Sequence, residues 1–245
     1  MNLIAHALYW QVNMFLKNIL PAILILYITN CFGQGNIQKS NRLTSDVTEK
    51  FFVLKDNQTI RDSSYQAFYR KRTVIVRGNY TQGKKSGRWA FYNPRGLLLQ
   101  VYDYDRNTLK YEAREDTTSY LRYLVDKELS DSDKVTKPVK IGGRYYGYLP
   151  YVGLYKTPLD IDAMSASSFV VVVELLISPL GRLADYKVHV VSDMLNYDQT
   201  TTMDVNLFSE EDKEFLPATI NGQPILSRIL IRCRMVDGGG LDFFY

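Results

Sequence analysis

A His, a Ser and an Asp near residue 190 are the residue types in this sequence that come nearest to catalytic chemistry. His189, Ser192 and Asp193 would supply a base, a hydroxyl nucleophile and a carboxylate, as in acyl-transferring hydrolases. The segment 186–191 alternates apolar and polar residues, which predicts a β-strand. Because side chains alternate faces along a strand, His189 and Ser192 point to opposite sides and cannot share a hydrogen bond. The spacing therefore argues against a triad.

Other candidate groups have a structural explanation. Glu210, Glu211 and Asp212 could form a carboxylate site, but acidic residues are also typical of a solvated helix start. The glycine runs at 142–143 and 238–240 lack the following helix that a phosphate-binding loop needs. We therefore predict a non-catalytic protein with no cofactor and no metal site. A hydrolase whose site the sequence does not reveal is the competing hypothesis.

Composition narrows the class of protein further. The chain has 245 residues, of which 30 are Lys or Arg and 26 are Asp or Glu, giving a net charge of +4. That charge is too small to predict nucleic-acid binding. Two Cys and two His leave almost nothing for a metal site, whereas 19 Tyr and 11 Phe favour β structure.

The N-terminal segment reads as a targeting signal. Residues 1–33 contain one charged residue, Lys17, before the apolar run Ile19–Ile28, and small residues follow. This pattern predicts a secretory signal peptide cleaved between Gly33 and Gln34, and hence a periplasmic or otherwise exported protein.

Two alternatives for the same segment involve the membrane. Leu3–Phe32 is long enough to be an uncleaved inner-membrane anchor, and Cys31 could be lipidated. After cleavage, Cys233 and His189 would be the only remaining Cys and His, so no disulfide could form within the mature chain. We expect both to be packed strand residues.

The elements needed to position any site begin after a polar tether predicted at 34–48. Residues 69–77 are predicted to form a strand. In the residues after it, short aromatic strand segments alternate with turns that contain glycine. The spaced motif comprises Gly78, Tyr80, Gly83, Gly87, Trp89, Tyr92 and Gly96. We expect Lys84, Lys85 and Arg88, at the tip and flank of this hairpin, to be solvated.

This spacing resembles a MORN-like repeat, more narrowly the repeat of YwqK-type antitoxin proteins. The resemblance implies that 49–115 is a region of successive β-hairpins with aromatic residues packing one hairpin on the next. One good copy is present, and a degraded continuation follows at Val101–Tyr111. The repeat is structural and does not by itself imply an activity.

Residues 116–157 are predicted to be a helical and irregular linker. Apolar residues between Tyr120 and Leu129 are spaced as in an amphipathic helix, which would end in the polar segment Ser130–Lys134. The Gly- and Tyr-rich segment 141–148 predicts an irregular connection or an edge hairpin.

The last third of the chain predicts a small antiparallel sheet. Phe169–Ile177, Tyr186–Val191 and Ile225–Met235 each carry one apolar face, and Cys233 belongs to the apolar face of the last. A short helix from about Ser209, after an extended piece, is the predicted cover, although residues 200–208 also fit a strand period. The tail 237–245 would cover the sheet edge or fray.

The order of elements within 158–236 resembles the TonB C-terminal domain. The motif residues are Gly181, Pro217, Ala218, Asn221, Gly222 and Pro224, with Phe215 where a Trp is usual and Ile225 where a Val is usual. In energy-transducing members of that family the domain pairs a strand with a short peptide of an outer-membrane transporter. The resemblance implies Ile225–Met235 as the edge strand that would accept such a peptide.

Together these patterns predict a β-rich α+β protein of the cell envelope with a binding or structural role. The predicted partner is a peptide or envelope protein rather than a nucleic acid. The predicted contact residues lie on the polar face of the last strand: Arg228, Leu230, Arg232 and Arg234. A membrane-anchored, TonB-like transducer is the alternative, but the chain has only 8 Pro and no Pro-rich spacer.

Overall fold

A computed structural model describes residues 35–115, 119–158, 166–236 and 240–243. It consists mainly of antiparallel β-strands with one short α-helix among these residues, which confirms the predicted β-rich fold class. The predicted signal peptide, its cleavage site at Gly33 and Gln34, and Cys31 lie outside the described residues. Within them, no helix has the length and hydrophobicity needed to cross a membrane.

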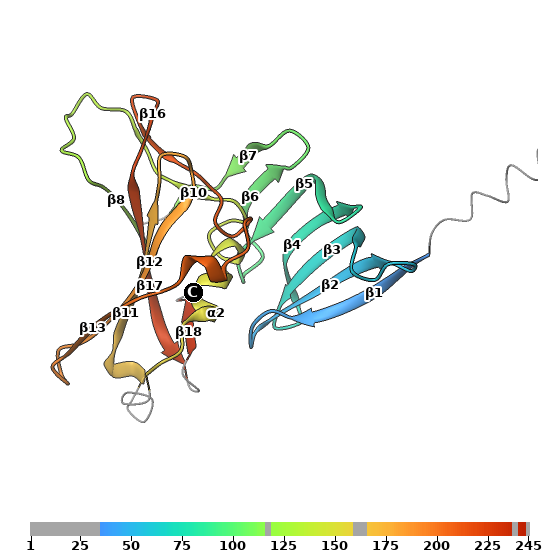
Figure 1. Ribbon diagram of the computed structural model, residues 1–245, viewed down its shortest axis with the longest axis horizontal. Coiled ribbons are helices and arrows are strands. Elements are labelled where there is room, and N and C mark those ends of the chain that lie inside the picture. Colours follow the sequence, from blue (N-terminus) through green and yellow to red (C-terminus); the bar gives the residue numbers. More distant parts are fainter. Residues whose placement is uncertain (1–34, 116–118, 159–165, 237–239, 244–245) are drawn as a thin grey trace, which may run out of the picture.

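The first sheet is a seven-stranded antiparallel meander in which each strand pairs with the next in the chain (Figure 1). Its strands are β1 (Asn36–Arg42), β2 (Val47–Leu54), β3 (Arg61–Tyr69), β4 (Thr73–Thr81), β5 (Lys84–Tyr92), β6 (Leu98–Asp103) and β7 (Thr108–Glu112). The tether predicted at 34–48 was therefore wrong, because all seven residues of β1 pair with β2. A strand at the edge of a sheet needs no apolar face, so its polar composition gave no strand pattern.

The predicted repeat residues form the β4–β5 hairpin and its surroundings. Gln82 and Gly83 both have positive φ angles, 50° and 82°, as a tight two-residue hairpin turn requires. Trp89 lies edge-on to Tyr80, with ring centroids 5.2 Å apart, and has no exposed surface. Gly78 lies directly beneath the indole, where a Cβ would be 2.1 Å from a ring carbon. Of the remaining motif residues, Gly87 lies within β5 with a positive φ, Tyr92 ends that strand, and Gly96 lies in the turn that follows.

The second sheet has the order β13-β12-β11-β17-β18, with β8 also paired to β17. Its strands are β8 (Leu121–Val125), β11 (Val170–Ile177), β12 (Leu183–Ser192), β13 (Tyr197–Thr202), β17 (Ser227–Val236) and β18 (Gly240–Phe243). The strand predicted as a free edge, β17, is interior. It pairs with β11 on one side, and with β8 and β18 on the other. The tail thus contributes a paired strand.

In the outer strand β13, only every second residue directs its backbone N–H and C=O towards β12. Met203 N–H donates to Tyr186 O at 2.8 Å, and inter-strand bonds in an antiparallel pair recur at every second residue. The N–H of Thr200 consequently points away from β12.

The predictions of two helices were wrong. Residues 121–125 form β8 because pairing with Ser227–Ile231 of β17 outweighs a helical spacing of apolar residues. Residues 209–214 form a turn instead of a helix, although Ser209 still accepts the Asp212 N–H at 3.2 Å through its hydroxyl. The short η4 (Val205–Leu207) precedes this turn.

The cover of the second sheet comes from the segment predicted to be irregular. It contains η2 (Tyr146–Tyr148) and α2 (Leu149–Leu154), and its tyrosines fill the space between the two sheets. Tyr151 has no exposed surface, and its hydroxyl donates to Asp212 O. The Tyr186 hydroxyl donates in turn to Tyr151 O. The two sheets therefore share one continuous set of buried side chains.

Short strands complete the fold around Gly181 and the segment 215–225. They are β9 (Val135–Thr136), β10 (Val139–Lys140), β14 (Phe215–Leu216), β15 (Ala218–Ile220) and β16 (Gln223–Ile225). The short η3 (Ala166–Ser168) precedes β11. Asn221 and Gly222 form the β15–β16 turn with φ angles of 53° and 81°, between Ala218 and Pro224 on the paired strands. Gly181 has a φ of 71°, and a Cβ there would be 2.3 Å from Phe215 O and 3.2 Å from Pro217.

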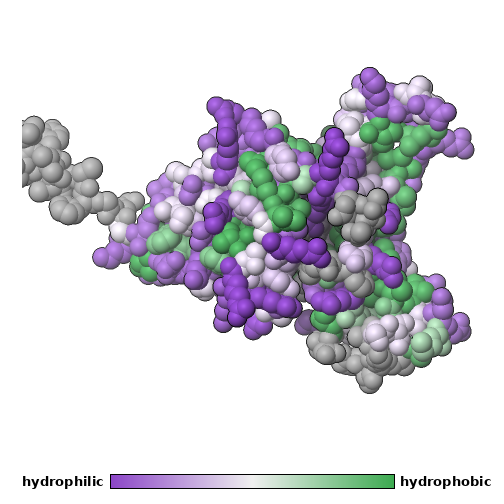
Figure 2. Space-filling view, turned by 180° about the vertical axis from the view of Figure 1, so that it is seen from behind, coloured by the Kyte–Doolittle hydropathy of each residue, from purple (hydrophilic) through white to green (hydrophobic). Residues whose placement is uncertain are grey.

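The face of the molecule that is turned away from the viewer in Figure 1 carries both hydrophobic and hydrophilic side chains. In Figure 2, hydrophobic patches of this face are separated by hydrophilic side chains and do not form one continuous surface.

Candidate functional site

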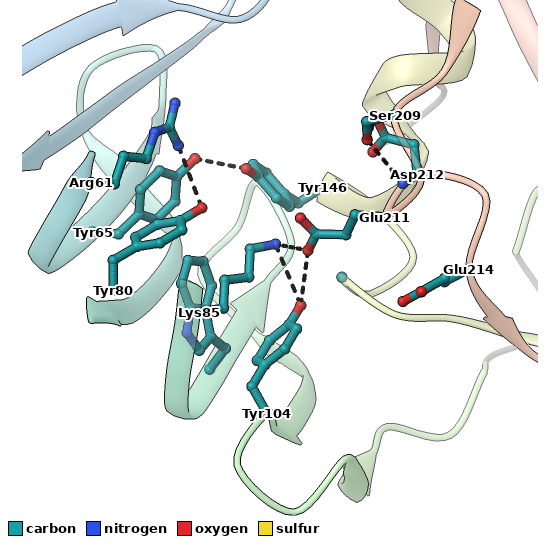
Figure 3. A network of polar contacts seen from close by, with 12 residues as sticks. Arg61, Tyr65, Tyr80, Lys85, Tyr104, Tyr146, Ser209, Glu211, Asp212 and Glu214 are labelled. Atoms are coloured by element: carbon teal, nitrogen blue, oxygen red, sulfur yellow. Dashed lines mark hydrogen bonds and ion pairs between the residues drawn. The ribbon is translucent and has the colours of Figure 1, made fainter. Parts of the chain in front are cut away.

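A cleft of about 560 Å³ lies between the first sheet and the segments that cover the second. Strands β2 to β5 contribute its polar floor, and α2 with residues 207–212 forms the opposite wall (Figure 3). The volume falls within the range typical of ligand-binding pockets, roughly 300–1,000 Å³. The cleft is therefore the candidate functional site.

One end of the floor is built around a buried carboxylate. Glu49 of β2 is 2% exposed and accepts from Arg61 of β3 at 2.7 Å and from the Tyr65 hydroxyl at 2.8 Å. Tyr65 also shares a hydrogen bond of 2.6 Å with Tyr146, which links the two halves of the molecule. Burial, together with Tyr146 and Glu49, raises the pKa of Tyr65 well above its usual value. The Glu49 carboxylate is therefore paired with Arg61 and held in place by two hydrogen-bond donors.

The other end of the floor holds a lysine between aromatic rings. Lys85 Nζ lies 4.7 Å from the Trp89 ring centroid and 5.2 Å from that of Tyr104. It forms an ion pair with Glu211, and Tyr104 hydroxyl also approaches that carboxylate at 3.4 Å. The Lys85 side chain is only 13% exposed, so the expectation that it is solvated was wrong. Cation–π contacts and a partner distant in sequence hold it inward.

Lys140 stabilises the turn 209–214, which belongs to the wall of the cleft opposite the floor. Its ammonium donates to three backbone carbonyls, those of Glu211, Asp212 and Glu214, at 2.8 to 3.0 Å. Burial lowers the pKa of Lys140 to about 8, opposed by the nearby carboxylates. Since all three donor positions of the ammonium are used, Lys140 shapes the turn 209–214 and offers no free amine to a ligand.

The three neighbouring acids predicted as a possible carboxylate site do not converge. Glu210 pairs with Arg182 and Lys213, whereas Glu211 pairs with Lys85 across the cleft. The Asp212 carboxylate instead accepts from the Ser209 hydroxyl at 2.7 Å. Among the described residues, no three His, Cys, Asp or Glu side chains are grouped as metal ligands.

The residues of the rejected triad are separated as predicted. His189 lies on the outer face of β12, with Nε2 2.8 Å from Glu174 and Nδ1 2.9 Å from Thr200. Ser192 is buried on the other face, and its hydroxyl accepts from Leu195 N–H. The prediction that His189 and Ser192 face opposite sides is confirmed.

Cys233 also lies where the strand pattern placed it. It is buried on the apolar face of β17, where burial raises the pKa of its thiol to about 12. A thiol that stays protonated at neutral pH is a poor nucleophile.

The predicted partner-contact residues share a face of β17 but do not line the cleft: Arg228, Leu230, Arg232 and Arg234. Arg228 pairs with Glu174 at 3.0 Å, and Arg234 pairs with Asp242 at 2.7 Å. The two paired guanidiniums are therefore occupied by the protein itself.

Sequence reasoning missed most of the cleft. Glu49 gave the only local signal, because it interrupts the apolar face formed by Val47, Phe51 and Val53 of the same strand. A charge on a buried face requires a partner, which Arg61 supplies. Tyr146 and Lys140 carried no comparable signal.

Known proteins provide no guide to this arrangement. No protein-family model, curated protein or solved structure matches the chain.

Proposed function

We propose that this chain is an exported, non-catalytic binding protein of the cell envelope, and that a peptide segment of its partner enters the inter-sheet cleft. The observation that carries this proposal is the combination of a floor bearing both charges with an apolar rim. The Lys85–Glu211 ion pair, whose carboxylate is half exposed, presents both charges to a ligand, while Leu43 and Leu154 line the rim. A peptide presents amides, charges and apolar side chains together, which suits such a surface.

The state of the ionisable groups supports binding over catalysis. Glu49 pairs with Arg61, Lys85 pairs with Glu211, and the Lys140 ammonium donates hydrogen bonds to three backbone carbonyls. A general base or nucleophile needs an available lone pair near the reacting atom, and each of these groups is already occupied. Strand addition to β17 is not part of the proposal, because both sides of that strand are paired.

Blocking the cleft tests the proposal. Gly153 lines it from α2, is exposed, and a Cβ built there meets no heavy atom within 4 Å. Gly153→Trp should therefore fill the cleft while preserving the fold, as a helical glycine is readily replaced. Met194→Trp, at an 80% exposed position outside the cleft, is the matched control.

The assay begins with selection of random displayed peptides on the full chain, followed by fluorescence anisotropy with the enriched peptides. We expect Gly153→Trp to weaken binding by about tenfold or more and Met194→Trp to leave it unchanged. Equal binding to both variants, or a selection that enriches no peptide, would refute the proposal.

A further inference from the structure

A second pocket, of about 340 Å³, lies apart from the cleft and shares no lining residue with it. It is formed by the β5–β6 turn, residues 113–115 and 119–121, Ile231 in the middle of β17 and Phe243 at the end of β18. Its lining is largely apolar: Leu97, Leu98, Leu99, Leu121, Tyr145, Ile231 and Phe243.

Exposed hydrophobic side chains gather at this pocket. Leu97 is 62% exposed, Leu98 37% and Tyr120 38%, and all three line it. Exposed apolar residues scattered singly need no explanation, whereas a cluster around a concavity is typical of a binding site. The pocket can therefore shield an apolar group from water.

The rim of the pocket is positively charged. Arg95 and Arg114 are exposed and line it, and within the described part of the chain their guanidiniums form no hydrogen bond or ion pair. Arg144 is occupied, because it donates to the carbonyls of Ala113 and Arg114 and lies 3.7 Å from Glu115. Two guanidiniums are thus available to an anionic group, which they would bind by charge-assisted hydrogen bonds.

The backbone around the pocket disfavours a ligand rich in amides. Leu97 O accepts from Asn93 N–H at 2.9 Å, and Leu99 O accepts from Ala113 N–H at 2.8 Å. Ala113 O is in turn used by Arg144. Because these three carbonyls already accept hydrogen bonds, the apolar part of the pocket suits a hydrocarbon chain, which needs no hydrogen-bond partners, better than a peptide backbone.

We infer that this pocket binds a free medium-chain fatty acid, with the chain against Leu98 and its neighbours and the carboxylate at Arg95 and Arg114. The apolar pocket and the two available guanidiniums together match an amphiphile with one negative charge. This site is independent of the proposed peptide cleft.

Calorimetric titration of the full chain with decanoate, below its micellar concentration, tests the inference against 1-decanol as the uncharged analogue. The double variant Arg95→Ser/Arg114→Ser should weaken decanoate binding about tenfold or more and leave decanol binding unchanged. Arg72→Ser/Arg77→Ser, which removes two exposed arginines outside the pocket, is the charge-matched control. Leu98→Asp should abolish binding of both ligands.

Several results would overturn the inference: no decanoate binding, equal affinity for decanoate and decanol, or equal loss in the two arginine double variants. Tighter binding of N-acetyl-trileucine than of decanoate would indicate a peptide terminus instead. Gly153→Trp should leave decanoate binding intact, which separates failure of this site from failure of the cleft.

Discussion

Replacing Gly78 by alanine should destabilise the protein through a single steric conflict. The new Cβ would lie 2.1 Å from Cδ2 and 2.2 Å from Cε2 of Trp89, whereas unstrained carbon–carbon contacts are about 3.5 Å or longer. The indole would have to move by roughly an ångström or more to relieve the overlap.

Trp89 has no room for that movement. It has no exposed surface, stacks on Tyr65 with centroids 5.1 Å apart, and donates from Nε1 to Asn79 O at 3.2 Å. Overpacking a core typically costs about 1–3 kcal/mol, and removing a buried Trp altogether costs about 3–5 kcal/mol. We expect Gly78→Ala to lower the free energy of unfolding by about 3 kcal/mol, between these limits.

Urea denaturation followed by far-UV circular dichroism measures this loss. Gly87→Ala is a contrasting variant, because Gly87 has a φ of 64°, which Gly78 lacks, but no heavy atom lies within 4 Å of a Cβ built at Gly87. It should cost about 1–2 kcal/mol. In a Trp89→Ala background the further change Gly78→Ala should cost almost nothing, because the clash is gone. A similar cost of Gly78→Ala in both backgrounds would show that the indole is not the cause.

Three further predictions test other parts of the structure. Cys233 should resist iodoacetamide at neutral pH in the folded chain, because burial raises the pKa of its thiol to about 12, and it should react in concentrated guanidinium chloride. Peptide mass mapping locates the alkylated residue, and alkylation of Cys233 in the folded chain would contradict this prediction. A double-mutant cycle of Lys85→Met and Glu211→Gln should give a coupling of about 0.5–1 kcal/mol, since Glu211 is half exposed, and zero coupling in urea denaturation would contradict the ion pair. Thr200→Pro should lower the thermal stability little, because the N–H of Thr200 points away from β12. Leu230→Pro should prevent folding, because Leu230 lies in the interior strand β17, and equal thermal stability of the two variants would contradict the strand order.

Strands that bury one complete face were predictable from sequence. Val170–Ile177, Leu183–Ser192 and Ser227–Val236 each repeat apolar residues with period two, and the structure has a strand at each. Pairing partners were not predictable in the same way. The edge assignment of β17 failed because one of the two strands on its other side, Leu121–Val125, has apolar residues that fit a helix spacing equally well.

The cleft could not be predicted because its contacts join distant parts of the chain. Lys85 and Glu211 are 126 residues apart in sequence, and Tyr65 and Tyr146 are 81 apart. No local period encodes such pairs, and they become neighbours only once both sheets have formed. A buried Glu49 could signal a need for a partner, but could not identify Arg61 as that partner.

The two ion pairs of the cleft differ in how easily a ligand can replace them. Glu49 is almost completely buried and receives hydrogen bonds from both Arg61 and Tyr65, so removing one partner would leave an uncompensated buried charge. The Lys85–Glu211 pair has a half-exposed carboxylate, and exposed pairs contribute little to stability. A charged ligand can therefore exchange with Glu211 for Lys85 at small cost, whereas Glu49 and Arg61 remain fixed. The first sheet provides the floor of the cleft, and selectivity for the charge of a ligand should reside at the end of the floor that holds Lys85.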